Sequence, residues 1–313
     1  MKRASVLVAA LVIALSFSFV LAGCSSSSYT PQAKDSTVSS SALNTDGVLR
    51  VGVNASNAPY AAEQSGEIVG IDVDVAAALA DEMGLKLELV DVGSNVASAF
   101  ESDNVDIVLG VKENVEGCWL SDPYMHSAVA LFSTDENASA PDASGSFMIS
   151  AQSSSMSAWD VTDRYGEDHL NGTNDLQGAF DALANGEANY AAADSTIGAY
   201  VAHDSGMDVY PIALLGDPVS NCIAVADSNT ALQTALTNAL QNIKDNGVIN
   251  VIITKWLGQV SDITSLQVIP EPTNNGDTNA DNQDAGNTDT DTNANAGAGD
   301  ADTTATADQD AAA

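Results

Sequence analysis

The sequence predicts an α/β protein, and three observations support this fold class. Residues 70–90, GIDVDVAAALADEMGLKLELV, have the pattern of a helix followed by a strand. A short apolar strand at 49–54 comes before them, so the order is strand, loop, helix, strand, which requires a crossover connection and parallel pairing. The alternation starts again after residue 147. Repeated βαβ units place functional side chains at the carboxyl ends of the strands.

The helix within 70–90 is predicted from its apolar spacing. Val75, Leu79 and Met83 recur on one helical face, and Asp72 is placed as an N-cap. Gly84 is expected to end the helix, and the following strand at 85–90 alternates with period two.

The remaining patterned sequence contains two α/β series. Strands are expected at 105–110, 128–133, 147–152, 188–194, 209–212 and 221–226. Helices are expected at 95–101, 153–166, 175–187, 195–203, 230–244 and 248–257. A polar break at 134–144 separates the series, which predicts two lobes joined where 128–133 and 222–226 run side by side.

Composition excludes two classes of partner. Acidic residues outnumber basic ones 43 to 9, for a net charge of −34. Such a chain is repelled by nucleic acid and by anionic membrane surfaces.

The amino terminus has a charged start, an apolar run at 6–21 and then LAGC, which resembles the bacterial lipoprotein lipobox. The resemblance implies a signal peptide at 1–23, acylation of Cys24 (palmitate among the acyl chains), and an extracytoplasmic, lipid-anchored protein. The alternative is an uncleaved transmembrane anchor. Residues 24–46 are polar and predict a flexible tether, and 263–313 predict a disordered acidic tail.

Eight short matches in order give the chain a family resemblance. They are LRVGV, GIDVD, VDIVLG, SDPY, AQ before a serine-rich turn, AAADS, NCIAVA and GVINVIITKWLG. Together, over 48–258, they resemble the extracellular solute-binding proteins of ABC importers, specifically the polar-amino-acid family. The resemblance implies a two-lobed, periplasmic-binding-protein-like (type II) fold with two hinge strands. Lobe 1 is then expected at 47–130 plus 225–262, and lobe 2 at 131–224.

The resemblance also implies a function. A monomer captures a small polar solute, an amino acid or derivative, by hinge closure and presents it to membrane permease subunits, with no cofactor. One alternative is a ligand sensor or surface lipoprotein that does not transport. A cyclohexadienyl dehydratase-like enzyme is disfavoured, because that chemistry needs a cationic cleft and the chain has few cations.

An amino acid offers an ammonium and a carboxylate, and each needs a partner once water is expelled. Asp194 ends an apolar strand and matches the family's amine-binding Asp; the alternative is a helix cap. Ser154 and Ser155 follow a strand ahead of a helix and are candidate oxygen ligands, together with Gln152 in the matched turn. The alternative for the serines is an ordinary loop.

The first lobe departs from the family pattern. The segment 110–124 lacks the Arg that grips the α-carboxylate, and Lys112 is the one cation at that strand end. Lys112 is either a point-charge substitute or a solvated loop residue. Tyr60 matches the family's stacking aromatic, and Trp119 is either a cleft wall or a packing residue.

The cysteines and the histidines are the remaining side chains that could form cross-links or bind a metal. With Cys24 acylated, Cys118 and Cys222 remain, and an even count outside the cell predicts a disulfide near the lobe junction. The three histidines share no metal-ligand spacing, and the order of residue types fits no catalytic triad, so neither a metal site nor catalytic residues are expected.

Overall fold

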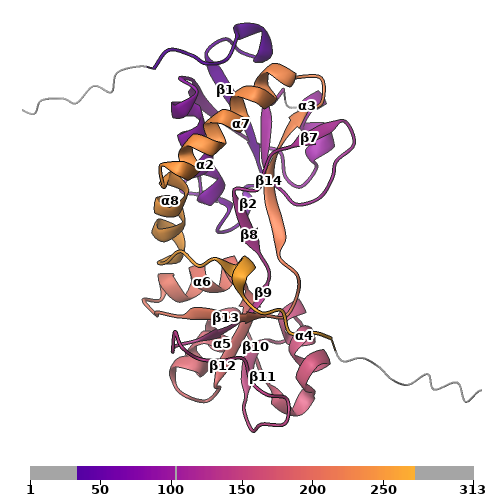
Figure 1. The fold of residues 1–313 in the computed structure, drawn as a ribbon, viewed down its shortest axis with the longest axis vertical. Helices are drawn as coiled ribbons and strands as arrows, with labels where there is room; N and C mark the ends of the chain where they lie inside the picture. The colour runs from indigo at the N-terminus through magenta and orange to yellow at the C-terminus, as the bar shows by residue number, and fades with distance from the viewer. Residues whose placement is uncertain (1–33, 103, 272–313) are drawn as a thin grey trace, which may run out of the picture. The chain divides into compact units, whose positions relative to one another are not determined.

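The computed structural model describes residues 34–102 and 104–271, which contain two principal β-sheets (Figure 1). We call the part built on the first sheet lobe 1 and the part built on the second lobe 2. The first sheet has the order β5 (Lys86–Asp91), β1 (Val48–Val53), β6 (Ile107–Val111), β14 (Val219–Ala226) and β7 (Cys118–Leu120), with β8 (Met125–Ser127) pairing to β14. The second has the order β11 (Leu170–Thr173), β10 (Ile149–Gln152), β12 (Tyr190–Asp194), β9 (Val129–Ser133) and β13 (Tyr210–Leu214). A small third sheet contains β2 (Ser56–Asn57), β3 (Ala61–Gln64) and β4 (Glu67–Val69).

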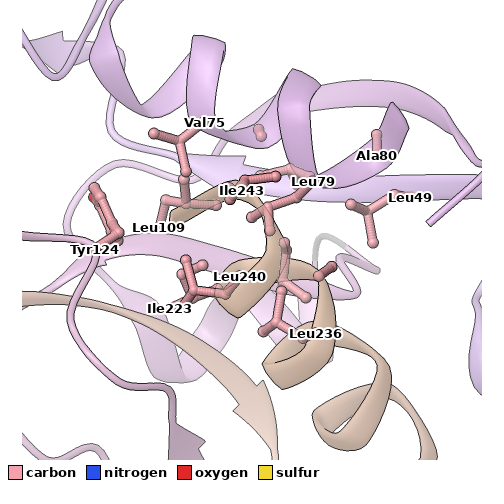
Figure 2. Packing of buried hydrophobic residues seen from close by; sticks show 14 of the residues in the cluster. Leu49, Val75, Leu79, Ala80, Leu109, Tyr124, Ile223, Leu236, Leu240 and Ile243 are labelled. Atoms are coloured by element: carbon pink, nitrogen blue, oxygen red, sulfur yellow. The ribbon is translucent and has the colours of Figure 1, made fainter. Parts of the chain in front are cut away.

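Lobe 1 is held by helices packed on the first sheet. These are α2 (Ile71–Glu82), α3 (Val96–Ser102), α7 (Thr230–Asp245) and α8 (Val248–Leu257). Figure 2 shows apolar side chains of α2 and α7 meeting over strands β1, β6 and β14; the labelled residues include Leu79, Leu236, Leu49, Leu109 and Ile223. The last two long helices therefore belong to lobe 1, as the resemblance implied.

The helix predicted from an N-cap at Asp72 to a stop at Gly84 is confirmed, but it starts two residues earlier. Gly70 is the N-cap, with φ +151°, and Asp72 is the second residue of the helix with its side chain buried. A Cβ on Gly70 would lie 2.1 Å from the carbonyl oxygen of Tyr60, so only glycine permits this approach. Gly84, at φ +70°, ends the helix as expected.

Lobe 2 has three helices on the second sheet: α4 (Met156–Tyr165), α5 (Leu176–Ala184) and α6 (Ser195–Asp204). Three short 3₁₀ turns complete the described chain: η1 (Ser40–Ala42), η2 (Glu167–His169) and η3 (Ile263–Ser265). No helix within 34–102 and 104–271 has the length and apolarity needed to cross a bilayer.

The junction of the lobes differs from the predicted pairing of 128–133 with 222–226. Strand β9 lies between β12 and β13 in the second sheet, whereas β14 belongs to the first sheet. The antiparallel pairing instead forms one segment earlier, between β8 and residues 219–221 of β14. The exact residue limits of the two lobes stay a prediction.

The segment 34–46, expected as part of a flexible tether, is ordered against lobe 1. Val38 and Ala42 join its apolar core, and Thr37 donates its backbone N–H to the Met83 carbonyl at 3.0 Å. The packing of these two apolar residues and this backbone hydrogen bond hold the otherwise polar segment against lobe 1. The predicted signal peptide, Cys24 and the tether up to residue 33 lie outside the described residues.

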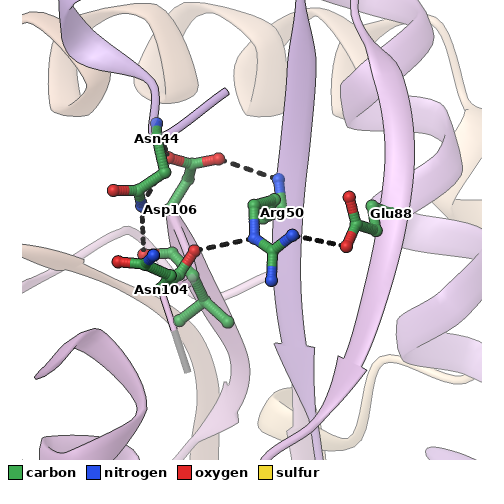
Figure 3. A network of polar contacts seen from close by, with 6 residues as sticks. Asn44, Arg50, Glu88, Asn104 and Asp106 are labelled. Carbon is green, nitrogen blue, oxygen red and sulfur yellow. Dashed lines mark hydrogen bonds and ion pairs between the residues drawn. The ribbon is translucent and has the colours of Figure 1, made fainter. Parts of the chain in front are cut away.

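Asp106 anchors this segment to the sheet. Its buried carboxylate accepts hydrogen bonds from the Asn44 backbone N–H (2.8 Å), the Asn44 side chain (3.0 Å) and the Arg50 backbone N–H (2.8 Å) (Figure 3). Beside it, the Arg50 guanidinium bonds to Glu88 and to the Asn104 carbonyl.

We expect Asp106→Ala to lower the free energy of unfolding by about 2 kcal/mol, because it leaves backbone N–H groups without a partner. Urea denaturation of both proteins at one pH measures the change. The matched control is Asp142→Ala, whose carboxylate is exposed and bonds only to Ser144. An equal loss in the two variants would contradict this role for Asp106.

The predicted tail begins later than residue 263. After α8 the chain crosses to lobe 2, where Val268 bridges to Leu214 and the Ile269 N–H donates to the Leu214 carbonyl at 2.8 Å. Arg164 of α4 donates from Nε to the Ile269 carbonyl at 3.1 Å. A third segment, 258–269, therefore connects the lobes in addition to the β8–β9 and β13–β14 connections. The rest of the predicted tail, 272–313, lies outside the described residues.

Candidate functional site

Three predicted site residues come together at the lobe junction. Lys112 directly follows β6, Asp194 ends β12, and Tyr60 lies between β2 and β3. Lys112 and Asp194 thus extend from the carboxyl ends of strands in different sheets, where side chains of a doubly wound fold meet a ligand.

Tyr60 lies at the centre of this group. The Lys112 ammonium is 5.4 Å from the centre of the Tyr60 ring, a cation–π distance. Burial, and next the negative charge of Asp194, raise the pKa of Tyr60 to about 12. The hydroxyls of Thr196 and Ser127 lie near the Tyr60 hydroxyl and oppose this rise in its pKa. Neither forms a hydrogen bond of ordinary geometry with the Tyr60 hydroxyl.

Asp194 is both a helix cap and a charged group at the junction. Its Oδ1 accepts hydrogen bonds from the Thr196 and Ile197 amides at 2.9 and 3.0 Å. Burial raises the pKa of Asp194, and the two amides and the Lys112 charge oppose the rise. Both capping bonds use one oxygen, so the cap orients the carboxylate while Oδ2 has no hydrogen bond from any described residue.

The lobe 2 residues Gln152, Ser154 and Ser155, predicted as ligand contacts, are a helix cap and two exposed side chains in the structure. Ser155 is the N-cap of α4, and its hydroxyl accepts from the Ala158 amide at 3.1 Å. Ser154 is exposed at φ +60°, and Gln152 is exposed at the end of β10. No hydrogen bond or ion pair within the described residues joins these three to Asp194 or Lys112. Their ligand roles stay predictions.

Trp119 and the cysteines have structural positions. Trp119 lies in β7 opposite Val225 and packs, half-buried, against the lobe 1 core. The predicted disulfide is wrong, since Cys118 and Cys222 are both free thiols. The register pairs Cys118 with Ala226, four residues from Cys222 along β14. At about 3.4 Å per residue, that separation is roughly 14 Å, more than twice the usual Cα–Cα span of a disulfide.

Neither arginine of the described chain is near this group. Arg50 bonds to Glu88 and Asn104, and Arg164 bonds to Asp160 and to the Ile269 carbonyl. Both guanidiniums therefore stabilise lobe structure, and Lys112 is the cation beside Tyr60.

A cavity of about 710 Å³ opens beside Lys112 in lobe 1. Its walls include the polar residues Asn54, Asn57, Asn95 and Asp72. Volume and polar lining are those of a site for a small polar molecule. Among the described residues, no cluster of His, Cys, Asp or Glu has the arrangement of a metal site.

Sequence reasoning missed Asp72 and Tyr124 as neighbours of this cavity. The Tyr124 hydroxyl donates to Asp72 Oδ1 at 2.6 Å, and both side chains are buried. Burial raises the pKa of Asp72 to about 6, against the opposing Tyr124 hydrogen bond and the Lys112 charge. The available signal was the spacing of Asp72 with Val75 and Leu79, which places it on the buried face of α2.

Comparisons with known proteins agree with this architecture. Residues 49–259 match the family model described as bacterial extracellular solute-binding proteins, family 3. No curated protein matches the chain.

Several solved structures share the fold. A polar amino acid ABC uptake transporter substrate-binding protein from Streptococcus thermophilus aligns with a TM-score of 0.62 at 17% identity, over 72% of this chain and 92% of that one. The L-cystine solute receptor of Neisseria gonorrhoeae, unliganded and open, gives 0.57 at 18%, over 71% and 96%. An ancestral cationic amino acid solute-binding protein gives 0.52 at 23%, over 67% and 96%.

Proposed function

Because the chain belongs to the bacterial extracellular solute-binding proteins, family 3, we propose that it captures a small amino-acid-like solute between its lobes for an ABC importer. The observation that carries the proposal is the meeting of opposite charges from the two lobes around Tyr60. Asp194 provides the negative group, and Lys112 provides the positive one.

In the proposed complex, the Asp194 carboxylate accepts the solute's ammonium through Oδ2, while Oδ1 keeps the two capping bonds. Lys112 then pairs with the solute's carboxylate. A lysine is a point charge on a flexible stem, so it holds a carboxylate less directionally than an arginine fork. The Tyr60 ring supplies an apolar wall between the two charges.

We propose that the mature protein is anchored outside the cell through acylated Cys24 and presents the loaded form to permease subunits. Lobe closure is a hinge motion about the connecting strands. A sensor that binds the same solute without transport is the second candidate, and the lysine in place of the family's arginine favours it. Stimulation of the partner ATPase by the loaded protein distinguishes transport from sensing.

A thermal-shift screen of the twenty amino acids tests the proposal, because a ligand that binds only the folded state raises the melting temperature. Titration calorimetry of the amino acid with the largest thermal shift is expected to give a Kd of roughly micromolar, which corresponds to a binding free energy of about −8 kcal/mol. The corresponding amine without its carboxylate and the N-acetyl derivative are each expected to bind at least tenfold more weakly. Equal binding of all three compounds, or no shift by any amino acid, would contradict the proposal.

A further inference from the structure

A second cavity, of about 400 Å³, is lined by both lobes but not by Lys112 or Asp194. Its lining residues come mainly from α6 of lobe 2, α8 of lobe 1, residues 123–126 at the start of β8, and residues 259–264 of the crossing segment. Figure 1 shows α6 and α8 where the two lobes meet. Its volume is within the range of small-molecule sites in proteins. We call it the rear cavity, to distinguish it from the 710 Å³ cavity beside Lys112.

The rear cavity is separated from the cavity beside Lys112 by packed side chains. Tyr124 lines the rear cavity, and its hydroxyl bonds to Asp72, which lines the other one. Thr196 lines the rear cavity too, and it lies beside the Tyr60 hydroxyl. The two cavities therefore share a wall and have separate linings, so one can be filled without the other.

Most of the rear cavity's wall is apolar. The aliphatic contributors come from four separate elements, β8, α6, α8 and η3: Met125, Ala199, Ile249, Ile253, Leu257 and Ile263. Burying a hydrocarbon against such a surface yields about 25 cal/mol per Å² of apolar area removed from water. The lining thus fits the alkyl part of a ligand.

The rear cavity also has a positive group on its wall, which is unusual in this chain. Of nine basic residues, seven lie within the described ranges, and four of those form ion pairs with carboxylates. The other three are Lys86, Lys112 and Lys244, of which Lys112 and Lys244 each line a cavity.

Lys244 is held in place at the cavity wall by its own hydrogen bond. Its ammonium donates to the Pro123 carbonyl at 3.0 Å and is paired with no carboxylate of the described residues. His126, also on the wall, has Nδ1 3.5 Å from the Ser220 hydroxyl. The acidic wall residue, Asp262, has Oδ1 occupied by the Thr264 amide and hydroxyl. Asp262 keeps its charge but is engaged by Thr264, whereas Lys244 has no carboxylate partner among the described residues, so its ammonium is the wall group open to an anionic head group.

We infer that the rear cavity is a second ligand site, for a medium-chain carboxylate. The carboxylate pairs with Lys244, and the alkyl chain lies along α8 against Ile249, Ile253 and Leu257. An ammonium with four carbons of stem gives such a head group a charged partner without requiring a fixed approach direction.

Calorimetric titration with octanoate, below the concentration at which it forms micelles, tests the inference. We expect saturable binding of one octanoate per protein, and octylamine should bind at least tenfold more weakly because its charge is reversed. Lys244→Met should weaken octanoate binding at least tenfold. Equal binding of the two compounds, or a titration that does not saturate, would overturn the site.

A pair of tryptophan variants on α8 locates the binding. Ile253→Trp fills the rear cavity and should abolish octanoate binding, whereas Val251→Trp adds the same bulk to a side chain that is 70% exposed and should change nothing. Thermal melts establish that both variants fold. If Ile253→Trp does not fold, Lys244→Met and the octylamine comparison decide the question. Unchanged octanoate binding by a folded Ile253→Trp would refute the location.

Discussion

Asp194→Asn is expected to weaken binding of the screened amino acid at least a hundredfold while leaving the folded protein about as stable as before. The affinity falls because the solute's ammonium loses its negative partner in a site from which water is expelled, at a cost of about 3 kcal/mol. Stability is kept because asparagine caps a helix as well as aspartate does. Calorimetry and urea denaturation of the same preparation measure the two effects.

Because Asp194 also caps α6, the substitution that tests its charge must preserve the cap. Asp194→Ala removes both the charge and the acceptor of the Thr196 and Ile197 amides, so it should cost about 1 kcal/mol of stability as well as the affinity. Asp175→Asn is the matched control, because Asp175 is also a helix N-cap, accepting from the Gly178 amide of α5, and lines neither the cavity beside Lys112 nor the rear cavity. Retention of affinity by Asp194→Asn, or an equal loss in Asp175→Asn, would remove Asp194 from the site.

The same residue predicts how affinity depends on pH. Burial raises the pKa of Asp194 in the unliganded protein, so its carboxyl takes up a proton at a higher pH than an ordinary aspartate does. Only the ionised form pairs with an ammonium. Affinity should therefore decline as the pH falls through that raised pKa, and the Asp194→Asn protein should lack this decline.

Local pattern was enough to predict much of the fold. The apolar spacing of Val75 and Leu79 predicted α2, and Gly84 predicted its end, because a helix face and a left-handed terminating residue are properties of neighbouring positions. The parallel strands followed from the βαβ order. The order of β9 and β14 in different sheets did not follow, since pairing between distant strands depends on packing that single segments do not reveal.

The sequence predicted individual residues of the site, but not how they come together in space. Asp194 and Lys112 each stand at a strand end that the sequence marks, but their meeting around Tyr60 depends on how two sheets are joined. The disulfide prediction failed for a related reason. Counting cysteines gives their number, whereas pairing needs the register of β7 against β14.

Asp72 shows how a two-residue shift of the helix start changes the role of a side chain. An aspartate at an N-cap is solvated and accepts backbone amides, whereas Asp72, the second residue of the helix, turns toward the core. The structure has the second arrangement, with the carboxyl 3% exposed and bonded to the Tyr124 hydroxyl. A buried acid of this kind makes stability depend on pH in the direction opposite to that of an ion-paired one.

We expect the contribution of Asp72 to the free energy of unfolding to fall by about 3 kcal/mol between pH 2 and pH 7, with about 2 kcal/mol of that fall above pH 4. Burial raises its pKa from 3.8 to about 6 in the folded protein, so the folded state binds the proton more tightly than the unfolded chain does. The stabilisation is complete below pH 3.8 and is lost as the pH rises through about 6. Two pKa units correspond to about 3 kcal/mol.

Asp72→Asn isolates this contribution, because the amide is neutral at every pH and its oxygen still accepts from the Tyr124 hydroxyl. Subtracting its unfolding free energy from that of the unmodified protein at each pH cancels the other carboxylates. The difference should favour the variant increasingly from pH 4 to pH 7. Tyr124→Phe removes the hydrogen bond that lowers the pKa of Asp72, so it should move the same transition to higher pH. A difference that stays constant over this range would mean that Asp72 ionises as an ordinary surface aspartate does.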